Sequence, residues 1–522
     1  MSDMLIMANR IRDWVKRSPD LDVLTFVSID ESGNFIDEVR SYQQLWDNGQ
    51  RLAHWLRQQG MKEGEAFALI MANHPEFVEF MVASSILGLV FVPIDPRTKG
   101  EKLRYMLEFS GCKGAVVADY ALDNVMSEWG DRDDAWIIAL GGGDHGDQVA
   151  TVLQAPLPSP ELPVISTDVD APMQMLFTSG TTGDPKGILS SHRRFGEVGK
   201  LAGVLGLTVA DRPYTGLSLT HANAQLVTLG NSLSMGMRAV ISRKFTKSRL
   251  WDITRHYGCT FFNLLGGMTT AIYAEKPKDN DADNPVRRIL SAGMPAAIWK
   301  DFSARFDVEL FEFYGAAEGG MTMNPPGIGP VGSCGKPIAS LEMKLFDDSG
   351  RESAVGEEGE ICFRNIDGSV PTVTYFKNPE ASAEKTRDGW LRMGDIGHVD
   401  DEGWLFFHWR KGGGIRRNGD FVNSAFVEKA LAEIDAVEDV FVYGVPIKNG
   451  APGEKDVVAV IVAADPSTFD SKDVFAQCRE KLESNFVPSY LQLVEEIPKT
   501  ASEKPQERFL LDAFDLDLVI SN

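Results

Sequence analysis

The segment best suited to chemistry is a loop rich in glycine and threonine. Met175–Gly187 reads MLFTSGTTGDPKG, an apolar strand followed by glycines, hydroxyl side chains and a lysine. Glycines let the backbone approach a phosphate closely, hydroxyl and N–H groups donate to its oxygens, and a lysine adds charge. The segment is not a Walker A loop, because Lys186 is followed by Gly187 instead of serine or threonine. We interpret it as a phosphate-binding loop, the alternative being a plain surface loop.

Four further motifs follow in chain order. They are Phe313–Glu318 (FYGAAE), Asp388–Asp395 (DGWLRMGD), a segment that begins at Arg410, and Pro498–Lys504 (PKTASEK). Taken singly, each is explained by a turn, a surface charge or a core residue. Together with Phe177–Gly187, which matches [YF]TSGTTG-x-PKG, they resemble in order the signatures of the adenylate-forming acyl-CoA synthetase superfamily. That superfamily includes firefly luciferase and the adenylation relatives of peptide synthetases, and the resemblance covers nearly the whole chain.

The resemblance implies a nucleotide site for ATP and AMP. The phosphate loop would close on the β- and γ-phosphates, through Thr178, Ser179, Gly180, Thr181, Thr182, Gly183 and Lys186. Tyr314 would stack on adenine, with Gly293 close to the ring and Gly315 and Ala317 beside the nucleotide. Asp395 would accept hydrogen bonds from the ribose hydroxyls, assisted by Arg410.

The resemblance also implies the groups that act on the acid and on coenzyme A. Glu318 and Thr178 would ligate Mg²⁺, a hard cation that prefers oxygen ligands. Lys504 would reach the substrate carboxylate and the α-phosphate. His221 would separate the acyl pocket from the thiol tunnel, unless it is an ordinary hydrogen-bonded histidine. Arg416 and Gly419 would lie near CoA, although Arg416 and its neighbour Arg417 fit an exposed loop equally well.

The implied activity is that of an AMP-forming acyl-CoA synthetase, an acid–thiol ligase. A carboxylic acid would attack the α-phosphorus of ATP, pyrophosphate would leave, and a thiol would then take the acyl group from AMP. Lys504 and Mg²⁺ would offset the repulsion between two anions. A closing domain would keep water from the activated acyl group. The alternatives are transfer to a carrier protein's phosphopantetheine, and a nucleotide-binding homologue with a weakened first half-reaction.

Four residues depart from the family pattern. Ala317 and Met393 stand where threonines are usual, Glu503 replaces a glycine before Lys504, and Gly412 occupies a hinge position that is often Asp or Lys. A carboxylate at Glu503 would hold Lys504 back through a local ion pair. Because the loop from Thr178 to Lys186, Glu318, Asp395 and Lys504 are all present, we expect adenylation to proceed. The four departures bear on the rate of this first half-reaction.

The acid is not chosen by the sequence. The expected walls of the acyl pocket are Leu217–Gln225, Asn263–Met268 and Gly315–Ala316, which contain no arginine or lysine. A second carboxylate on the substrate is therefore disfavoured, while Asn223 and Gln225 indicate some polarity. The stretch Thr220–Gln225 (THANAQ) resembles crotonobetaine/carnitine-like ligases, and medium-chain, aromatic and bile or steroid acids stay open.

The elements that position these residues predict an α/β fold. Helical patterns alternate with short apolar runs such as 66–71, 90–94 and 114–118, which is typical of parallel sheets. We expect a large N-terminal domain, 1–410, with two doubly wound parallel-type sheets and a small β subdomain at about 332–409. A small mobile α+β domain, 411–522, would carry Lys504 beyond a hinge at 410–413, where successive glycines accept unusual backbone angles.

Composition excludes several classes of protein. The formal net charge is −23, which disfavours nucleic acids and anionic membrane surfaces as partners. The five cysteines are scattered without metal-ligand spacing, as in reduced cytoplasmic proteins. No apolar run is long enough for a bilayer span, so no integral membrane association is expected. The sequence is compatible with a homodimer.

Overall fold

The computed structural model describes residues 2–143, 146–177, 185–197, 201–411, 415–417, 420–422, 424–446, 455–482, 484–500 and 503–522. The chain forms two compact units. The first contains Met1–Thr246, Asp252–Asn263 and Val373–Ser382, and the second contains Lys247–Trp251, Leu264–Thr372 and Ala383–Asn522. The domain boundary expected at 410–413 does not coincide with these units, and residues 412 and 413 lie outside the described residues. That boundary stays a prediction.

The first unit contains a largely parallel sheet. Its strands are β3 (Ala66–Ile70), β4 (Val90–Ile94), β5 (Gly114–Ala118), β6 (Trp136–Leu140), β7 (Pro172–Phe177) and β8 (Gly187–Ser191). Their order is β6-β5-β3-β4-β7-β8, with β8 antiparallel to β7 and the other neighbours parallel. Every residue of β3, β4 and β5 is buried. Burial on both faces explains their unbroken apolar runs, as predicted.

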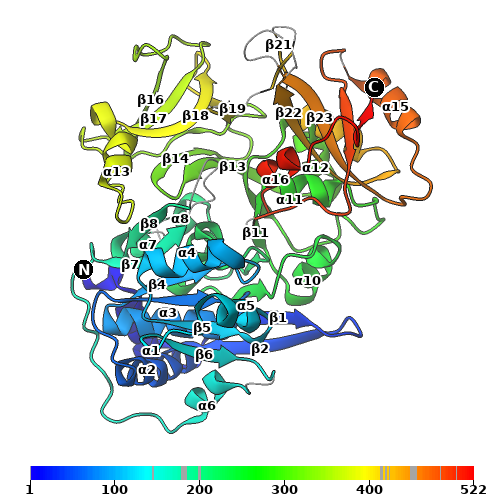
Figure 1. Cartoon of the computed structure of the whole chain (residues 1–522). Coiled ribbons are helices and arrows are strands. Elements are labelled where there is room, and N and C mark those ends of the chain that lie inside the picture. Colours follow the sequence, from blue (N-terminus) through cyan, green and yellow to red (C-terminus); the bar gives the residue numbers. More distant parts are fainter. Residues whose placement is uncertain are drawn as a thin grey trace. The chain divides into compact units, whose positions relative to one another are not determined.

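Helices join these strands, as Figure 1 shows. The helix α3 (Pro75–Leu87) has proline in its first turn and ends at Gly88, whose φ of 64° is left-handed. It leads directly into β4, so this long apolar stretch is a buried helix followed by a buried strand. The other helices of this unit are α1 (Met7–Arg17), α2 (Tyr42–Gln58), α4 (Gly100–Ser110), α5 (Asp119–Trp129), α6 (Gln148–Gln154), α7 (His192–Glu197), α8 (Leu201–Val204) and α9 (Asn231–Met235).

A second set of strands in the first unit is also mainly parallel. It comprises β1 (Asp22–Ile29), β2 (Phe35–Ser41), β9 (Pro213–Thr215), β10 (Ala239–Ser242) and β11 (Phe261–Leu265). β1 pairs in parallel with β10 and antiparallel with β2, while β9 lies between β10 and β11. The pairing of β1 with β10 joins segments that are about 200 residues apart in sequence, which no local pattern indicates.

The second unit begins with strands that lead to the candidate site. They are β12 (Arg288–Ala292), β13 (Glu309–Ala316), β14 (Gly319–Asn324) and β15 (Lys336–Pro337). β12 and β13 are parallel and are joined by α12 (Ala296–Phe306), whereas β13, β14 and β15 are antiparallel neighbours. Two further helices precede them in the chain: α10 (Leu250–Tyr257), most of which belongs to the first unit, and α11 (Gly266–Tyr273).

The expected small β subdomain is present in the second unit. Its strands are β16 (Leu341–Phe346), β17 (Gly359–Asn365), β18 (Leu391–Val399) and β19 (Leu405–Arg410), and each neighbouring pair is antiparallel. The helix α13 (Pro379–Lys385) precedes β18. This subdomain supplies two predicted site residues, Asp395 on β18 and Arg410 at the end of β19.

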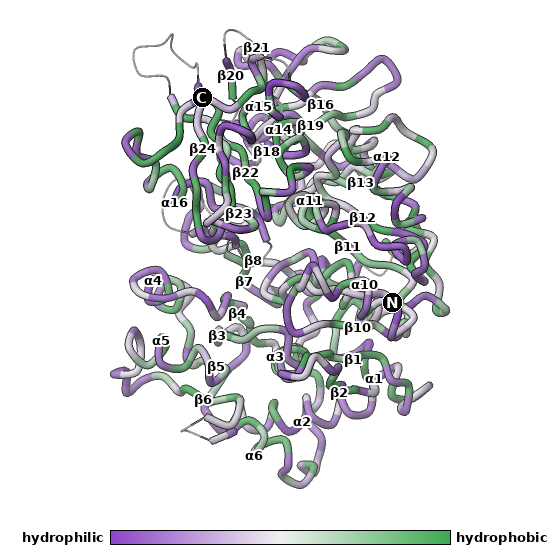
Figure 2. Tube along the Cα trace, turned by 90° about the vertical axis from the view of Figure 1, so that its right-hand side faces the viewer, coloured by the Kyte–Doolittle hydropathy of each residue, from purple (hydrophilic) through white to green (hydrophobic). Residues whose placement is uncertain are grey.

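The C-terminal segment is α+β, as predicted. Its sheet contains β22 (Val437–Pro446), β23 (Lys455–Ala463), β24 (Tyr490–Leu493) and β25 (Ile520–Ser521), in that order. Its helices are α14 (Ser424–Ala432), α15 (Ser471–Lys481) and α16 (Glu507–Asp512). The buried side chains of Val427, Leu431, Val457 and Val474 pack in one core. Figure 2 shows the hydrophobic residues along β22 and β23.

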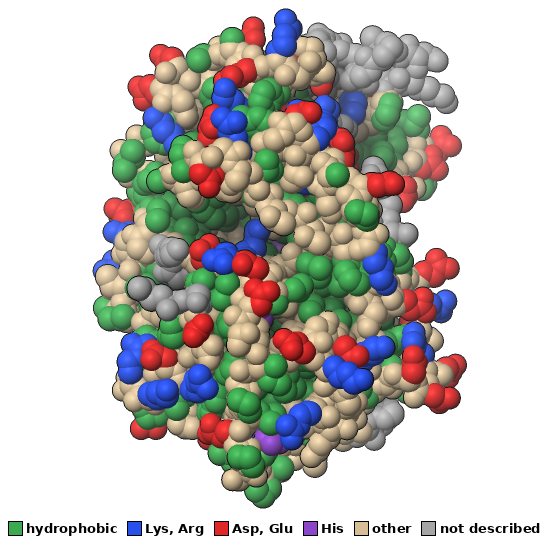
Figure 3. All heavy atoms as spheres, turned by 90° about the vertical axis from the view of Figure 1, so that its left-hand side faces the viewer, with side chains coloured by type: hydrophobic (Ala, Val, Ile, Leu, Met, Phe, Trp, Pro, Cys, Tyr) green, Lys and Arg blue, Asp and Glu red, His purple; other side chains and the backbone are tan. Residues whose placement is uncertain are grey.

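Three features of the structure concern the classes of protein that composition disfavours: the surface charge, the state of the cysteines and the length of the apolar helices. On the face drawn in Figure 3, acidic and basic side chains are interspersed. All five cysteines are unpaired and buried. Within the described parts of the chain, none of the helices combines the length and apolar character that a membrane crossing requires.

Candidate active site

The parallel strands β12 and β13 bring two predicted residues to neighbouring strand ends. Ser291 lies opposite Glu312 in this pairing. Gly293 follows the end of β12, and Tyr314 lies near the end of β13. Open α/β sheets bind ligands at the carboxyl ends of their strands. Gly293 and Tyr314, both predicted to contact the nucleotide, therefore lie at the edge of the sheet where such folds bind ligands.

A buried carboxyl group fixes the turn that contains Gly293. Glu312 is 2% exposed. Its Oε1 accepts a hydrogen bond from the Gly293 N–H at 2.6 Å, and its Oε2 accepts one from the Met294 N–H at 2.9 Å. Burial raises the pKa of Glu312 to about 8, against the effect of these two donors. Gly293 has a φ of 89°, a conformation that favours glycine.

Tyr314 and Asp395 are hydrogen-bonded to each other. The Tyr314 hydroxyl donates to Asp395 Oδ2 at 2.6 Å, and Arg410 Nε lies 3.9 Å from Asp395 Oδ1. Asp395 and Arg410 are register partners on β18 and β19. Burial raises the pKa of Asp395, and the Tyr314 hydroxyl and nearby cations oppose that rise. The side chains expected at adenine and at ribose thus form one connected group.

Two lysines lie near this group. The charges of Arg410, Asp395 and Glu318 shift the pKa of Lys504, the predicted catalytic lysine. The same three groups shift the pKa of Lys385, a residue that was not predicted from the sequence. Lys504 is solvent-exposed as a residue. Even so, desolvation by nearby protein atoms is the main factor that lowers its pKa. Glu503 directly precedes Lys504 in the sequence, and the ion pair expected between them stays a prediction.

Glu318 is a buried carboxylate at the turn between β13 and β14. It is 9% exposed and precedes Gly319 and Gly320, both with positive φ. A Cβ on Gly315 would lie 2.8 Å from the Gly320 carbonyl oxygen, so glycine allows this close turn. Ala317 stands directly before Glu318 in the same turn.

The donor set at Glu318 fits nucleotide-bound Mg²⁺. Such an ion is usually held by one or two carboxylates together with phosphate oxygens and water. Among the described residues, no group of three or more His, Cys, Asp or Glu side chains is arranged to hold a metal alone. Thr178, the other predicted ligand, lies outside the described residues.

The predicted phosphate loop connects β7 to β8. Phe177 and Gly187 are paired at the base of this connection. Thr178, Ser179, Gly180, Thr181, Thr182 and Gly183 lie outside the described residues. Lys186 is exposed, with its Nζ 5.3 Å from the centre of the Tyr375 ring.

The expected acyl-wall segment contains a π-helix. The turn at His221 is followed by η3 (Ala224–Gly230), and the Gln225 N–H donates to the His221 carbonyl oxygen at 3.3 Å. Asn263 donates its amide N–H to Asn223 Oδ1, and Gln225 Nε2 donates to the Leu219 carbonyl at 2.6 Å. The polar groups expected to face a substrate are therefore partly used in holding the segment. π-Helical turns are frequent at functional sites.

The predicted CoA-side residues are only partly described. Arg416 belongs to β20 (Arg416–Arg417), which pairs with β21 (Asp420–Phe421), and Gly419 lies outside the described residues. Arg417 Nη1 donates to the Val487 carbonyl oxygen at 2.6 Å. Arg417 therefore ties this hairpin to the C-terminal segment.

Comparison with known proteins identifies the family. The model for AMP-binding enzymes matches residues 11–369, and the model for the AMP-binding enzyme C-terminal domain matches residues 427–504. The chain belongs to the AMP-binding enzyme family. The first match includes Tyr314 and Glu318, and the second includes Lys504.

Relatives and solved structures extend over nearly the whole chain. A crotonobetaine/carnitine–CoA ligase from Escherichia coli O7:K1 is 28% identical over 92% of this chain and 94% of its own length. The anthranilate CoA ligase AuaEII in complex with anthranoyl-AMP has a TM-score of 0.83 at 23% identity, covering 98% of this chain and 97% of its own. A benzoate CoA ligase from Burkholderia xenovorans LB400 has a TM-score of 0.79 at 20% identity, covering 97% and 99%. This AMP-binding enzyme therefore has the fold of these ligases.

Sequence reasoning missed Glu312 and Lys385. Glu312 precedes Tyr314 by two residues, so the period of a strand places both on one face of β13. That spacing was a usable signal for Glu312. Lys385 lies in a charged stretch, Glu384–Asp388, where nothing distinguishes it from a solvated lysine.

Proposed function

We propose that this AMP-binding enzyme is an acid–thiol ligase that joins a carboxylic acid to coenzyme A, with conversion of ATP to AMP and pyrophosphate. The observation that carries the proposal is the cluster of Tyr314, Asp395, Arg410 and Lys504. It combines an aromatic ring, a carboxylate and cations within one compact unit. The CoA ligases among its relatives, matched over 92% of this chain, favour CoA over a carrier protein.

In the first half-reaction, a carboxylate oxygen of the acid forms a bond to the α-phosphorus of ATP. The bond from that phosphorus to the bridging oxygen breaks, and pyrophosphate leaves with the electron pair. Asp395 would accept hydrogen bonds from the ribose hydroxyls and so orient the α-phosphorus. The Lys504 ammonium would stabilise negative charge on the attacking carboxylate and the α-phosphate.

In the second half-reaction, the CoA sulfur forms a bond to the acyl carbon, and the bond from that carbon to the AMP oxygen breaks. The thiol proton is lost and AMP leaves as the phosphate anion. The hinge at 410–413 would exchange Lys504 for the Arg416–Val422 face between the two steps, with Gly419 near the pantetheine. Water must be excluded throughout, because it would hydrolyse the mixed anhydride.

Glu318 would hold Mg²⁺, together with Thr178 and phosphate oxygens. When bound, this ion neutralises the polyphosphate and stabilises the charge on the leaving pyrophosphate. The burial of Glu318 and its place in the turn directly before Gly319 and Gly320 support this assignment.

The acid is proposed to carry a single carboxylate. The wall segments Leu217–Gln225, Asn263–Met268 and Gly315–Ala316 contain no cationic side chain to pair with a second one. The relatives named above act on crotonobetaine or carnitine, anthranilate and benzoate. Mass spectrometry of the acyl-CoA products from a mixed acid library with Mg-ATP would separate carnitine-like from aromatic substrates. A cytoplasmic location and a homodimer stay predictions from the sequence.

The assignment of Lys504 is tested with Lys504→Ala. We expect ATP–pyrophosphate exchange to fall by at least about 100-fold, since a preorganised charge at the reacting centre is removed. Thioester formation from pre-made acyl adenylate should change less than about threefold, because a different face of the C-terminal segment serves that step.

The matched control is Lys499→Ala in the same tail. Lys499 Nζ pairs with Asp439 Oδ2 at 2.6 Å within the C-terminal segment and should leave the ratio of the two half-reactions unchanged. Equal losses in both half-reactions of Lys504→Ala would overturn the role given to Lys504. Wild-type protein that forms no AMP with any acid would overturn the proposed activity itself.

A further inference from the structure

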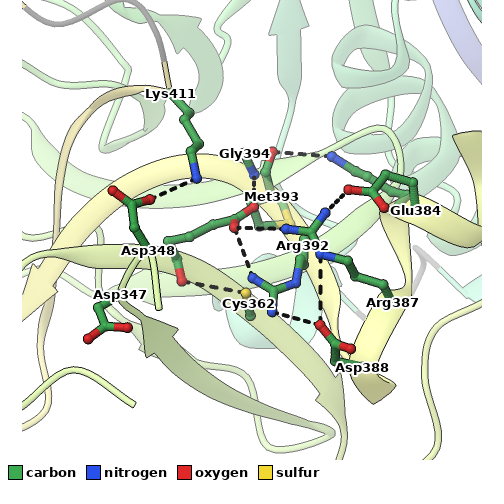
Figure 4. A network of polar contacts seen from close by, with 12 residues as sticks. Asp347, Asp348, Cys362, Glu384, Arg387, Asp388, Arg392, Met393, Gly394 and Lys411 are labelled. Atoms are coloured by element: carbon green, nitrogen blue, oxygen red, sulfur yellow. Dashed lines mark hydrogen bonds and ion pairs between the residues drawn. The ribbon is translucent and has the colours of Figure 1, made fainter. Parts of the chain in front are cut away.

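The backbone just before Asp395 is held from three directions. The Met393 carbonyl oxygen accepts a hydrogen bond from Lys385 Nζ at 3.2 Å. The Gly394 N–H donates to Glu360 Oε1 at 3.2 Å, and the Gly394 carbonyl oxygen accepts from the Lys411 N–H at 2.9 Å. In Figure 4, dashed lines reach the labelled Met393 and Gly394, and Lys411 lies beside them with its side chain directed to Asp348. Since Gly394 has a φ of 74°, the turn relies on these contacts to fix the direction of Asp395.

Glu360 has cationic partners of its own. Its Oε2 lies 3.0 Å from Arg392 Nη1 and 3.9 Å from Arg387 Nη2. Arg392 also donates to Asp388 Oδ2 at 3.2 Å. Figure 4 shows these arginines on one side of the turn. The carboxylate of Glu360 therefore has two arginine partners in addition to the charge of Lys385.

The charge of Lys385 also acts on the candidate site. Lys385 is the last residue of α13 and is half-buried. Desolvation lowers its pKa, as does Arg410 more weakly. Glu318, Asp395 and Glu360 act in the opposite direction because they stabilise the ammonium form, with Glu318 the strongest of the three. Both carboxylates are at most 9% exposed, so they need compensation by nearby cations. Asp395 in turn is stabilised as an anion by Arg410, Lys385 and Lys504.

We propose that Lys385 is a positioning residue of the nucleotide site, which holds Asp395 toward the ribose through the Met393 carbonyl and compensates its charge. Lys504 and Arg410 belong to the C-terminal segment and the expected hinge, so they are placed to move during the reaction. Lys385 precedes β18 and is separate from that segment. It therefore keeps Asp395 in place in either pose. This inference rests on the proposed ribose-binding role of Asp395.

The test is a set of variants measured for nucleotide binding by calorimetry. Lys385→Met removes donor and charge, Lys385→Gln keeps a donor, and Lys385→Arg keeps both. We expect Lys385→Met to weaken AMP binding about tenfold, with Lys385→Gln intermediate and Lys385→Arg within about twofold of wild type. Binding of 2′,3′-dideoxy-AMP should change less than about twofold, because the effect passes through the ribose hydroxyls. In turnover, KM for ATP should rise more than kcat falls.

Control measurements distinguish a wrong role for Lys385 from a wrong ribose contact for Asp395. Lys344→Met removes a surface pair with Glu352 on the same subdomain and should leave AMP binding unchanged. If Lys385→Met weakens AMP and dideoxy-AMP equally, or binds AMP as wild type does, the role of Lys385 is wrong. If wild-type protein does not distinguish AMP from dideoxy-AMP, the proposed ribose contact of Asp395 fails first.

Discussion

Asp395 uses its two carboxylate oxygens differently. Oδ2 accepts from the Tyr314 hydroxyl at 2.6 Å, while Oδ1 faces Arg410 Nε at 3.9 Å. Burial raises the pKa of this carboxyl group, while the neutral donor and the cation favour its ionised form. It is then ready to accept hydrogen bonds from a diol.

Tyr314→Phe tests this arrangement at the level of one atom. Removing the hydroxyl leaves a buried carboxylate with one donor fewer, while the ring that would face adenine is kept. We expect AMP binding to weaken about tenfold, from the loss of a hydrogen bond to a charged group. Calorimetric titration with AMP measures it. Tyr443→Phe, which removes a buried hydroxyl bonded to Gln492 at 2.8 Å, is the control and should leave AMP binding unchanged.

At the scale of elements, β12 and β13 present their site residues because Glu312 connects the two strands. Its carboxyl oxygens accept from the N–H groups of Gly293 and Met294, just past the end of β12. The segment proposed to pass along adenine is thus fixed by a side chain of the strand that carries Tyr314.

Glu312 also predicts a pH effect on stability. Its pKa is raised from 4.5 to about 8 in the folded protein, so the folded state holds a proton that the unfolded state releases. Its contribution is complete below pH 4.5 and is lost as pH rises to about 8. The loss is at most a few kcal/mol, at about 1.4 kcal/mol per unit of pKa difference. In Glu312→Gln, the midpoint of thermal unfolding should fall less between pH 5 and about 9 than in wild type. Parallel curves for the two proteins would contradict this.

Much of the element pattern could be predicted from sequence. Proline at the start of α3 and Gly88 at its end mark that helix, and short apolar runs mark β3 to β5. The pairing of β1 with β10 was not predictable, because it depends on contacts remote in sequence. Lys385 was also missed, since its role depends on a carbonyl and two carboxylates contributed by other elements. The motif residues Tyr314 and Asp395 were found, but their mutual hydrogen bond was not.

At the scale of the whole molecule, the C-terminal segment is docked within the second unit. Lys429 Nζ of α14 donates to the Ala297 carbonyl oxygen at 2.8 Å and lies 3.3 Å from Asp301 Oδ2, both on α12. This contact accompanies the pose in which Lys504 lies near Asp395 and Glu318. We regard it as one of the contacts that favour the adenylation pose.

Lys429→Met should therefore disfavour that pose. Because Asp301 is 59% exposed, we expect a modest effect, about a threefold slower ATP–pyrophosphate exchange. Thioester formation from pre-made acyl adenylate should be unchanged or faster, since the opposite pose gains population. Lys472→Met, at the start of α15, is the control. Equal slowing of both reactions would argue against a role in domain alternation.

The tip that carries Lys504 is closed by its own backbone. Lys499 and Pro505 form an antiparallel bridge, and the Thr500 N–H donates to the Lys504 carbonyl oxygen at 2.8 Å. Glu503, which departs from the glycine of the motif that this segment resembles, adopts a φ of 58°, so the left-handed geometry is present without the freedom of glycine. Because these bonds lie within the tip itself, we expect Lys504 to move together with the rest of the C-terminal segment, without rearranging the backbone pairing around it.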